Sequence, residues 1–132
     1  MTSKATPFLM FQGGVGREAA EFYVSLFDDG EILELEAWPA GTPAPEGTIM
    51  RGRIRVAGQE FLVSDSFVDH AFGFTPSLSV WIEAESPDAQ EALVTALGDG
   101  GDTLMPLDDY GFSRRFGWVN DRFGVSWQVN LA

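Results

Sequence analysis

Hydrophobic and polar residues alternate along eight short segments of the chain, and two longer segments carry apolar residues at spacings of three and four. Alternation is typical of a strand, whose successive side chains point to opposite faces, whereas the wider spacing gives one apolar stripe along a helix. We therefore predict one strand, one helix and three strands, and then the same order again. The predicted strands are 7–12, 31–38, 48–56, 59–66, 77–83, 102–108, 112–119 and 125–131, and the predicted helices are 16–27 and 87–97.

The ends of the second predicted helix are marked by the residues that flank it. Ser86 suits the cap, Pro87 the first helical position and Gly98 the stop. Apolar stripes run along both helices, so we expect each helix to lie on a sheet. The stripes consist of Ala19, Phe22, Tyr23, Leu26 and Phe27 in the first helix, and of Ala89, Leu93, Ala96 and Leu97 in the second.

Two segments rich in turn-forming residues interrupt the pattern. The first, AWPAGTPAPEGT, contains three prolines and two glycines and is predicted as an exposed loop between strands. The second, DSFVDHAFGFTP, joins the two halves of the repeat. A half of roughly 65 residues would supply little core by itself. We therefore expect a single domain over 1–132, made of two modules at about 1–68 and 75–132.

The polar face of two predicted strands also carries large rings. The apolar sets, which we expect to pack on helices, are Leu78, Val80 and Ile82 in the fifth strand, and Val125, Trp127, Val129 and Leu131 in the last. The opposite sets are Ser77, Ser79, Trp81 and Glu83, and Ser126, Gln128 and Asn130. These residues fit either the wall of a wet pocket or a half-exposed sheet with polar groups in water. The rings of Trp81, Phe112 and Trp118 favour the pocket.

The composition excludes several classes of function. The 132 residues include no cysteine and one histidine, which excludes disulfides, thiolate zinc sites, cysteine nucleophiles and most hydrolase triads. A formal net charge of −12 repels phosphate backbones and anionic lipid, so neither nucleic acid nor a membrane is expected as a partner. Apolar runs of membrane-spanning or signal-peptide length do not occur, so we expect a soluble, cytoplasmic protein.

The order strand, helix and three strands, occurring twice, resembles the vicinal oxygen chelate superfamily of glyoxalase, bleomycin-resistance and extradiol dioxygenase proteins. Several stretches are similar to its PhnB-like branch, whose members often carry the name demethylubiquinone 3-methyltransferase-like. They are TPFLMFQGG, REAAEFYVSLF, EGTIMRGRIRVAGQEFLVSDS, HAFGFTPSLSVWIE and MPLDDYGFSRRFGWVNDRFGVSWQVNL. The resemblance implies an α+β fold of two βαβββ modules, in which eight strands form a curved cup with two main helices. It also implies a homodimer.

The methyltransferase name implies S-adenosylmethionine, but the predicted strand order lacks the doubly wound sheet and glycine-rich first turn that usually bind this cofactor. The segment GGVG at 13–16 follows a strand and opens a helix, yet it lacks the remaining glycine spacing. Four-residue glycine clusters are also common in turns. We therefore expect no cofactor and regard methyl transfer as an unsupported function.

The superfamily's chemistry uses a divalent metal held by His and Glu side chains from four strands. Strand register carries those positions to Phe8, Leu62, Ser77 and Gln128, and a shift by two would replace Leu62 with Ser64. This set contains neither a carboxylate nor an imidazole, so we predict that no metal is tightly bound.

His70, in the connector, is predicted to be a hydrogen-bonded loop residue rather than a metal ligand or catalytic group. The neighbouring carboxylates Asp65 and Asp69 leave open a proton-transfer pair with this imidazole, although acidic residues beside connectors are also ordinary turn formers.

Two adjacent arginines in the predicted strand 112–119 must point to opposite faces. Arg114 would share a face with Phe112 and Phe116 and bind an anionic ligand, or it would pair with Asp108, Asp109 or Asp121 and tie strands together. Arg115 would face the helix side or a subunit boundary. The predicted pocket residues are Phe8, Met10, Gln12, Ser77, Ser79, Trp81, Tyr110, Phe112, Arg114, Trp118 and Gln128.

Together these features predict a metal-independent PhnB-like protein that binds a small anionic or aromatic molecule in the cup, as a homodimer. A metal-dependent lyase, isomerase or dioxygenase of the same fold is the alternative, and a resistance protein that sequesters its ligand without turnover is a third. Whether the protein is an enzyme is left open.

Overall fold

The computed structural model describes residues 2–132, and its elements follow the predicted order. The chain forms two compact units, Met1–Ala71 and Phe72–Ala132, each with one helix and four strands. The first unit contains β1 (Phe8–Gln12), α1 (Gly16–Ser25), β2 (Glu31–Ala37), β3 (Ile49–Val56) and β4 (Gln59–Ser66). The second contains β5 (Ser79–Glu83), α2 (Pro87–Gly98), β6 (Asp102–Asp108), β7 (Arg115–Asn120) and β8 (Ser126–Leu131). The predicted α+β fold of two βαβββ modules is confirmed.

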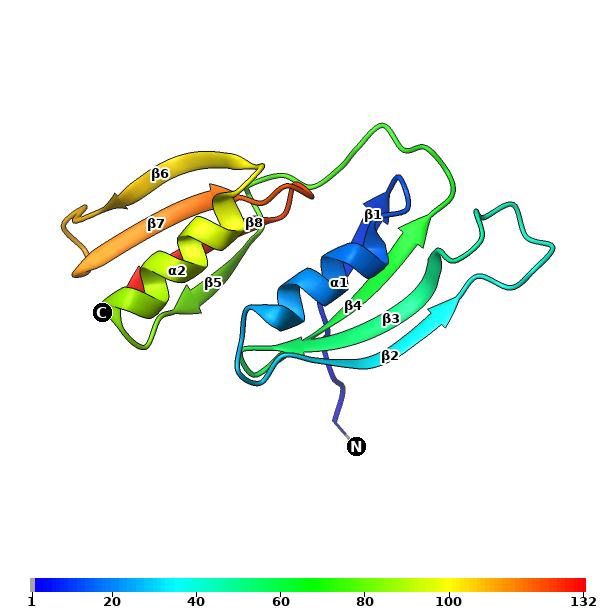
Figure 1. Cartoon of the computed structure of the whole chain (residues 1–132), viewed down its shortest axis with the longest axis horizontal. Helices are drawn as coiled ribbons and strands as arrows, with labels where there is room; N and C mark the ends of the chain where they lie inside the picture. Colours follow the sequence, from blue (N-terminus) through cyan, green and yellow to red (C-terminus); the bar gives the residue numbers. More distant parts are fainter. Residues whose placement is uncertain (1) are drawn as a thin grey trace. The chain divides into compact units, whose positions relative to one another are not determined.

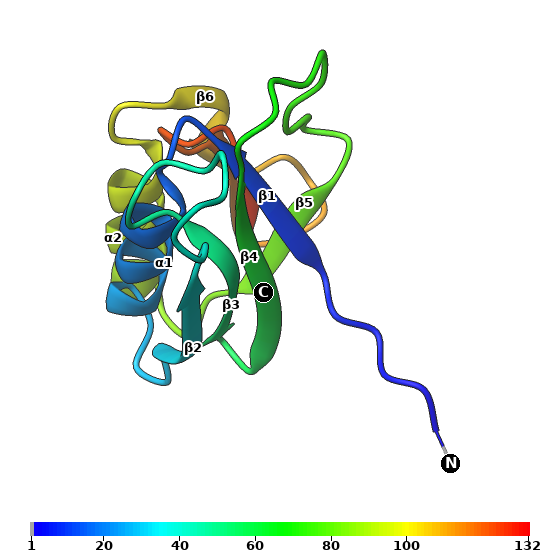
Figure 2. The same ribbon diagram turned by 90° about the vertical axis from the view of Figure 1, so that its right-hand side faces the viewer.

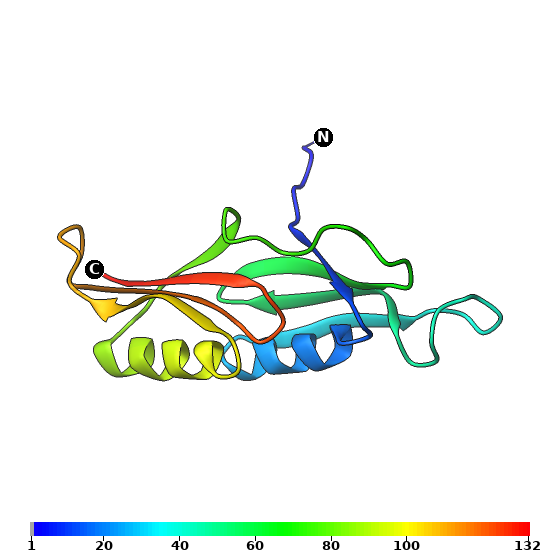
Figure 3. The ribbon, with the colours of Figure 1, turned by 90° about the horizontal axis from the view of Figure 1, so that it is seen from above.

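Each unit is a four-stranded sheet with its helix on one face (Figure 1). In the first unit the strand order is β1-β4-β3-β2, with β1 parallel to β4 and the other neighbours antiparallel. Figure 2 shows β1 and β4 side by side, with the N-terminal segment leading away from β1. The second unit repeats the arrangement as β5-β8-β7-β6, and α2 runs along one face of that sheet (Figure 3).

The core of each unit lies between the helix and the facing side chains of its sheet. In the first unit Ala19, Ala20 and Tyr23 of α1 are buried together with Phe11, Ile54 and Val63 of the strands. In the second unit Leu97 of α2 is buried with Ile82, Val119, Trp127 and Val129. The predicted apolar face of the last strand is confirmed, since Val125 and Leu131 are buried as well.

The two helices begin in different ways. As predicted, the Ser86 hydroxyl accepts a hydrogen bond from the Ala89 N–H (3.1 Å), and Pro87 occupies the first position of α2. The first helix has no side-chain cap of its own, and the carboxylate of Asp65 accepts the Gly16 N–H instead. Neither helix of the described part of the chain has the length and hydropathy to cross a membrane.

Three predicted boundaries differ from the structure by two residues or more. Helix α1 ends at Ser25 instead of 27, because the chain turns there and the Leu26 N–H bonds to the Tyr23 carbonyl. Strand β5 begins at Ser79 instead of 77, because the Leu78 N–H closes a turn on the Thr75 carbonyl. The predicted packing of Leu78 on a helix is wrong, since this residue is 79% exposed.

The third boundary concerns the arginine pair. Strand β7 begins at Arg115 instead of 112, so Phe112 and Arg114 lie in a bend before the strand. The Asp109 carboxylate accepts the N–H of Gly111 and so holds the bend. Gly111 has a φ of +96°, a backbone conformation that favours glycine.

Candidate ligand-binding surface

The face of the second sheet that α2 does not cover carries the predicted mixture of polar side chains and rings. Because the side chains of hydrogen-bonded neighbours share a face, the strand register assembles three rows. The rows are Ser79, Ser126 and Asn120, then Trp81, Gln128 and Trp118, and finally Glu83, Asn130 and Phe116. We call this surface the open face.

Four aromatic rings gather at one end of the open face. Phe116 is buried and lies at their centre, with ring centroids of Trp81, Tyr110 and Phe112 at 5.7, 6.1 and 5.0 Å. The three outer rings are 49%, 38% and 60% exposed, respectively. We call these four residues the ring cluster. So many accessible rings around one buried ring form an apolar platform on an otherwise polar strand face.

A carboxylate lies beside the ring cluster. Glu83 accepts the indole N–H of Trp81 at 2.8 Å and the side-chain amide of Asn130 at 3.1 and 3.3 Å. A carboxylate can only accept, so these contacts fix which end of the Asn130 amide carries nitrogen. The Asn130 side chain is 6% exposed, and its amide oxygen has no hydrogen-bond partner among residues 2–132.

Hydrogen bonds also fix the middle of the open face. The Ser126 hydroxyl accepts the indole N–H of Trp118 at 2.7 Å and lies 2.7 Å from the hydroxyl of Ser79. Gln128 is half-buried between Trp81 and Trp118, its direct neighbours on β5 and β7. Its amide therefore lies between the two indole rings.

The two arginines have different surroundings. Arg115 faces the helix, as predicted, and donates to the Gln90 side chain and the Pro87 carbonyl, both at 2.7 Å. Arg114 is exposed and, within the described chain, makes neither an ion pair nor a contact over a ring. Both predictions for Arg114, a place between Phe112 and Phe116 and a structural ion pair, are therefore wrong, because the residue precedes the strand.

The remaining predicted pocket residues lie elsewhere. Ser77 is in the turn before β5, where its hydroxyl contacts that of Thr75. Phe8, Met10 and Gln12 belong to the first unit, on the face of its sheet that α1 does not cover. That these residues line one cup with the open face stays a prediction.

The uncovered face of the first sheet is dominated by charge. Arg51, Arg53 and Arg55 alternate along β3 and form ion pairs with glutamates on β2 and β4. The hydrogen bond from the Lys4 ammonium lowers the pKa of Glu60 at this surface. The paired charges indicate a strand-to-strand network, not an unoccupied anion site.

The positions that hold a metal in the superfamily do not form a ligand set here. In the first unit the two positions, Phe8 and Leu62, are direct neighbours on β1 and β4. In the second unit the two positions, Ser77 and Gln128, are not neighbours, because Gln128 pairs with Trp81. Ser64, the candidate ligand if the register were shifted by two, donates a hydrogen bond from its hydroxyl to the Met50 carbonyl. Among residues 2–132 no group of three or more histidine and carboxylate side chains is arranged to hold a metal. The residues therefore do not fit the superfamily's metal.

His70 is a hydrogen-bonded loop residue, as predicted. Its ring nitrogen Nε2 lies 2.9 Å from the Ser66 hydroxyl, and its backbone N–H donates to the Gln12 side chain at 2.9 Å. Asp65 does not pair with this imidazole, because its two oxygens accept the backbone N–H groups of Gly16 and Ile49, each at 2.8 Å. The alternative of an Asp65–His70 proton-transfer pair is wrong.

The same carboxylate accounts for the glycine cluster at the start of α1. A side chain at Gly16 would place its Cβ 2.7 Å from the Asp65 carboxylate, and Gly13 adopts φ +86° in the turn. The glycines are thus required by the turn and by Asp65. The sheet also lacks the doubly wound order that an S-adenosylmethionine site would use.

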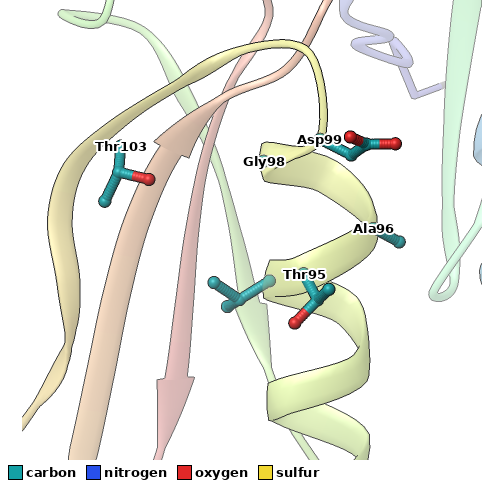
Figure 4. A pocket seen from close by; sticks show the side chains of 6 residues that line it. Thr95, Ala96, Gly98, Asp99 and Thr103 are labelled. Carbon is teal, nitrogen blue, oxygen red and sulfur yellow. The ribbon is translucent and has the colours of Figure 1, made fainter.

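Sequence reasoning missed several residues of the open face. Glu83, Asn130 and Phe116 were absent from the predicted pocket, although the alternation that selected Trp81 and Gln128 could have found the first two. A further hollow lies away from this face, at the end of α2 and beside β6 (Figure 4). It is lined by Val94, Thr95, Ala96, Gly98, Asp99 and Thr103, and it brings together none of the predicted pocket residues.

The two βαβββ units define a glyoxalase-like α+β fold. A glyoxylase/bleomycin resistance protein/dioxygenase domain from Frankia sp. has this fold, with a TM-score of 0.66 at 11% identity over 100% of this chain and 93% of that one. The chain belongs to the 3-demethylubiquinone-9 3-methyltransferase family, whose model matches residues 3–130. The predicted superfamily and PhnB-like branch are confirmed.

Individual relatives support this assignment. A PhnB protein from Bacillus cereus is similar, with 43% identity, a TM-score of 0.94, and coverage of 98% of this chain and 100% of that chain. YjdN of Escherichia coli is 23% identical over 97 residues, which are 74% of this chain. The match spans 65% of the length of YjdN.

Proposed function

We propose that this chain is a binding protein that holds a small, ring-bearing molecule on the open face without using a metal ion. The observation that carries the proposal is the ring cluster, in which Trp81, Tyr110 and Phe112 remain accessible around the buried Phe116. Offset or edge-to-face contacts between aromatic rings contribute about 0.5–1.5 kcal/mol each beyond the burial of apolar area. Several such contacts would hold a planar ligand of modest size.

The donor chemistry supports binding without a metal. Phe8 and Leu62 have no atom that could coordinate a cation, and the neutral oxygen of Gln128 would hold a transition metal only weakly. A lyase, isomerase or dioxygenase of this fold would need ligands that these positions do not supply. Purified protein dialysed without chelator is expected to hold less than stoichiometric zinc, nickel, manganese or iron. A stoichiometric metal would support the enzymatic alternative instead.

Methyl transfer has little support beyond the family's description. The glycines of the β1–α1 turn are accounted for by backbone conformation and by the Asp65 carboxylate. We therefore propose that the ligand is bound and released unchanged. Titration of the protein with S-adenosylmethionine is expected to give no saturable heat, and a micromolar isotherm would overturn this part of the proposal.

A calorimetric titration with 1-naphthalenemethanol, a neutral planar probe, tests the binding site. In buffer containing EDTA we expect saturable binding, which Trp81→Ala weakens about tenfold through the loss of stacking and apolar contact. Phe67→Ala is the matched control, because Phe67 is a 41% exposed ring in the first unit. Equal effects of the two substitutions would contradict the assignment of the site.

We also propose that the two units form one folding domain and that the protein is a cytoplasmic homodimer. The proposal of a dimer is supported by the family alone. Sedimentation equilibrium is expected to give twice the chain mass of 14.4 kDa, and a mass near that of one chain would refute it.

A further inference from the structure

Resting on the proposed binding at the ring cluster, we infer that the bound molecule is an organic cation, an ammonium group attached to an aromatic ring. Glu83 is its charged partner, and the faces of the outer rings receive the ammonium group. The structure carries this inference through the surroundings of Glu83, the balance of charge around the rings and the unpartnered oxygen of Asn130.

The charge of Glu83 is not compensated by a cation. Within residues 2–132 no lysine, arginine or histidine forms an ion pair with its carboxylate. Its three hydrogen bonds come from two neutral groups, the Trp81 indole and the Asn130 amide. These bonds hold the carboxylate against the edge of the ring cluster and leave its negative charge available to a ligand.

The rings themselves favour a cation. The face of an aromatic ring is negative and its edge positive, and tryptophan is the ring that attracts an ammonium group most strongly. Trp81 is 49% exposed and uses its indole N–H on Glu83, so a positive charge over this indole would be close to both the ring and the carboxylate. A carboxylate ligand at the same place would be repelled by both.

The nearby charges are mostly negative. Asp108 is the direct neighbour of Phe116 across β6 and β7, and Asp109 follows it in the chain. Arg114 is the basic residue at this end of the open face, and it is exposed in the bend before β7. The carboxylates of Glu83, Asp108 and Asp109 therefore outnumber the single guanidinium of Arg114. This balance favours a cationic ligand, whereas the sequence predicted an anionic ligand from Arg114 alone.

The Asn130 oxygen is a second acceptor beside Glu83. The side chain is 6% exposed, and the oxygen has no partner among residues 2–132, whereas the nitrogen is turned to Glu83. An unsatisfied buried acceptor is unfavourable, and a donor supplied with the ligand or by a water beside it would satisfy this oxygen. An ammonium group offers such donors and a carboxylate does not.

Calorimetry with three probes of one shape tests the inference. The probes are 1-naphthylmethylammonium, 1-naphthalenemethanol and 1-naphthoate, titrated at neutral pH and low salt into the full chain and two variants. We expect the cation to bind at least about fivefold more tightly than the alcohol, and the anion least tightly. Glu83→Gln keeps an acceptor for the indole N–H and is expected to abolish the advantage of the cation over the alcohol.

Glu85→Gln is the matched control, since it removes the same charge from an exposed residue two positions along the chain. If both variants weaken the cation equally, the preference comes from the net charge of the protein and the inference is overturned. If the alcohol binds but the anion binds as tightly as the cation, the inference fails and the proposed function stands. If none of the three probes binds, the proposed function fails with it.

Discussion

Replacing Asp65 with alanine is expected to destabilise the first unit strongly. The carboxylate is 2% exposed and accepts the N–H groups of Gly16 and Ile49, each at 2.8 Å, so it joins the start of α1 to the start of β3. The substitution would leave two buried donors without partners, and each such donor is unfavourable by about 1–3 kcal/mol. We therefore expect the free energy of unfolding to fall by about 2–5 kcal/mol, a large part of the total for a domain of this size.

Urea unfolding followed by far-ultraviolet circular dichroism measures this loss. The control is Asp69→Ala, which removes an exposed carboxylate four residues away and is expected to change the free energy of unfolding by less than about 0.5 kcal/mol. The reasoning would be refuted if Asp65→Ala were as stable as the unmodified protein.

A second substitution separates the carboxylate from the backbone it holds. Gly16→Ala places a Cβ 2.7 Å from the Asp65 oxygen, so it should be destabilising by itself. In the double variant the clash is gone because the carboxylate is absent. We therefore expect the two effects to sum to more than the double variant loses, by at least about 0.5 kcal/mol. Strict additivity would show that Asp65 and Gly16 act independently.

Two further predictions concern buried and exposed polar groups. Gln90 is fully buried and donates to the carbonyls of Arg115 and Val129, so Gln90→Leu should lower the free energy of unfolding by about 2–4 kcal/mol; an unchanged thermal midpoint would contradict this. The hydrogen bond from the Gly58 N–H lowers the pKa of Asp29 below its ordinary value. The stabilisation is therefore present above the unfolded pKa and is lost as pH falls through the lower folded pKa. Asp29→Asn should therefore flatten the acid limb of the stability curve, and an unchanged limb in urea titrations below pH 4 would refute the assignment.

The hydrophobic pattern predicted the sheets well because alternation reports directly which face of a strand is buried. The placement of Trp127 toward the helix and of Gln128 on the other face follows from period two alone, and the strand register agrees. The same alternation failed for Arg114. The start of β7 is set by the turn that Asp109 and Gly111 form, and periodicity carries no information about that turn.

The buried polar groups could not be predicted from the sequence for a different reason. Asp65 and Gln90 each bond to backbone groups at least 16 residues away, so their roles exist only after the sheet and helix have packed. In a one-dimensional pattern they look like an ordinary turn residue and an ordinary helix residue. The lack of a hydrogen-bond partner for the buried side-chain oxygen of Asn130 likewise depends on how its neighbours pack around it.

The indole N–H signals of the four tryptophans test the central claim most directly, because each has a different fixed partner. Trp81 bonds to Glu83 and Trp118 to Ser126 on the open face, whereas Trp38 bonds to the Asp65 carbonyl and Trp127 to the buried Asp121. In a nitrogen–proton correlation spectrum recorded with EDTA, 1-naphthylmethylammonium should shift the Trp81 signal most and the Trp118 signal next, in a saturable way. A saturable shift confined to Trp38 or Trp127, or no shift until a divalent metal is added, would contradict the account.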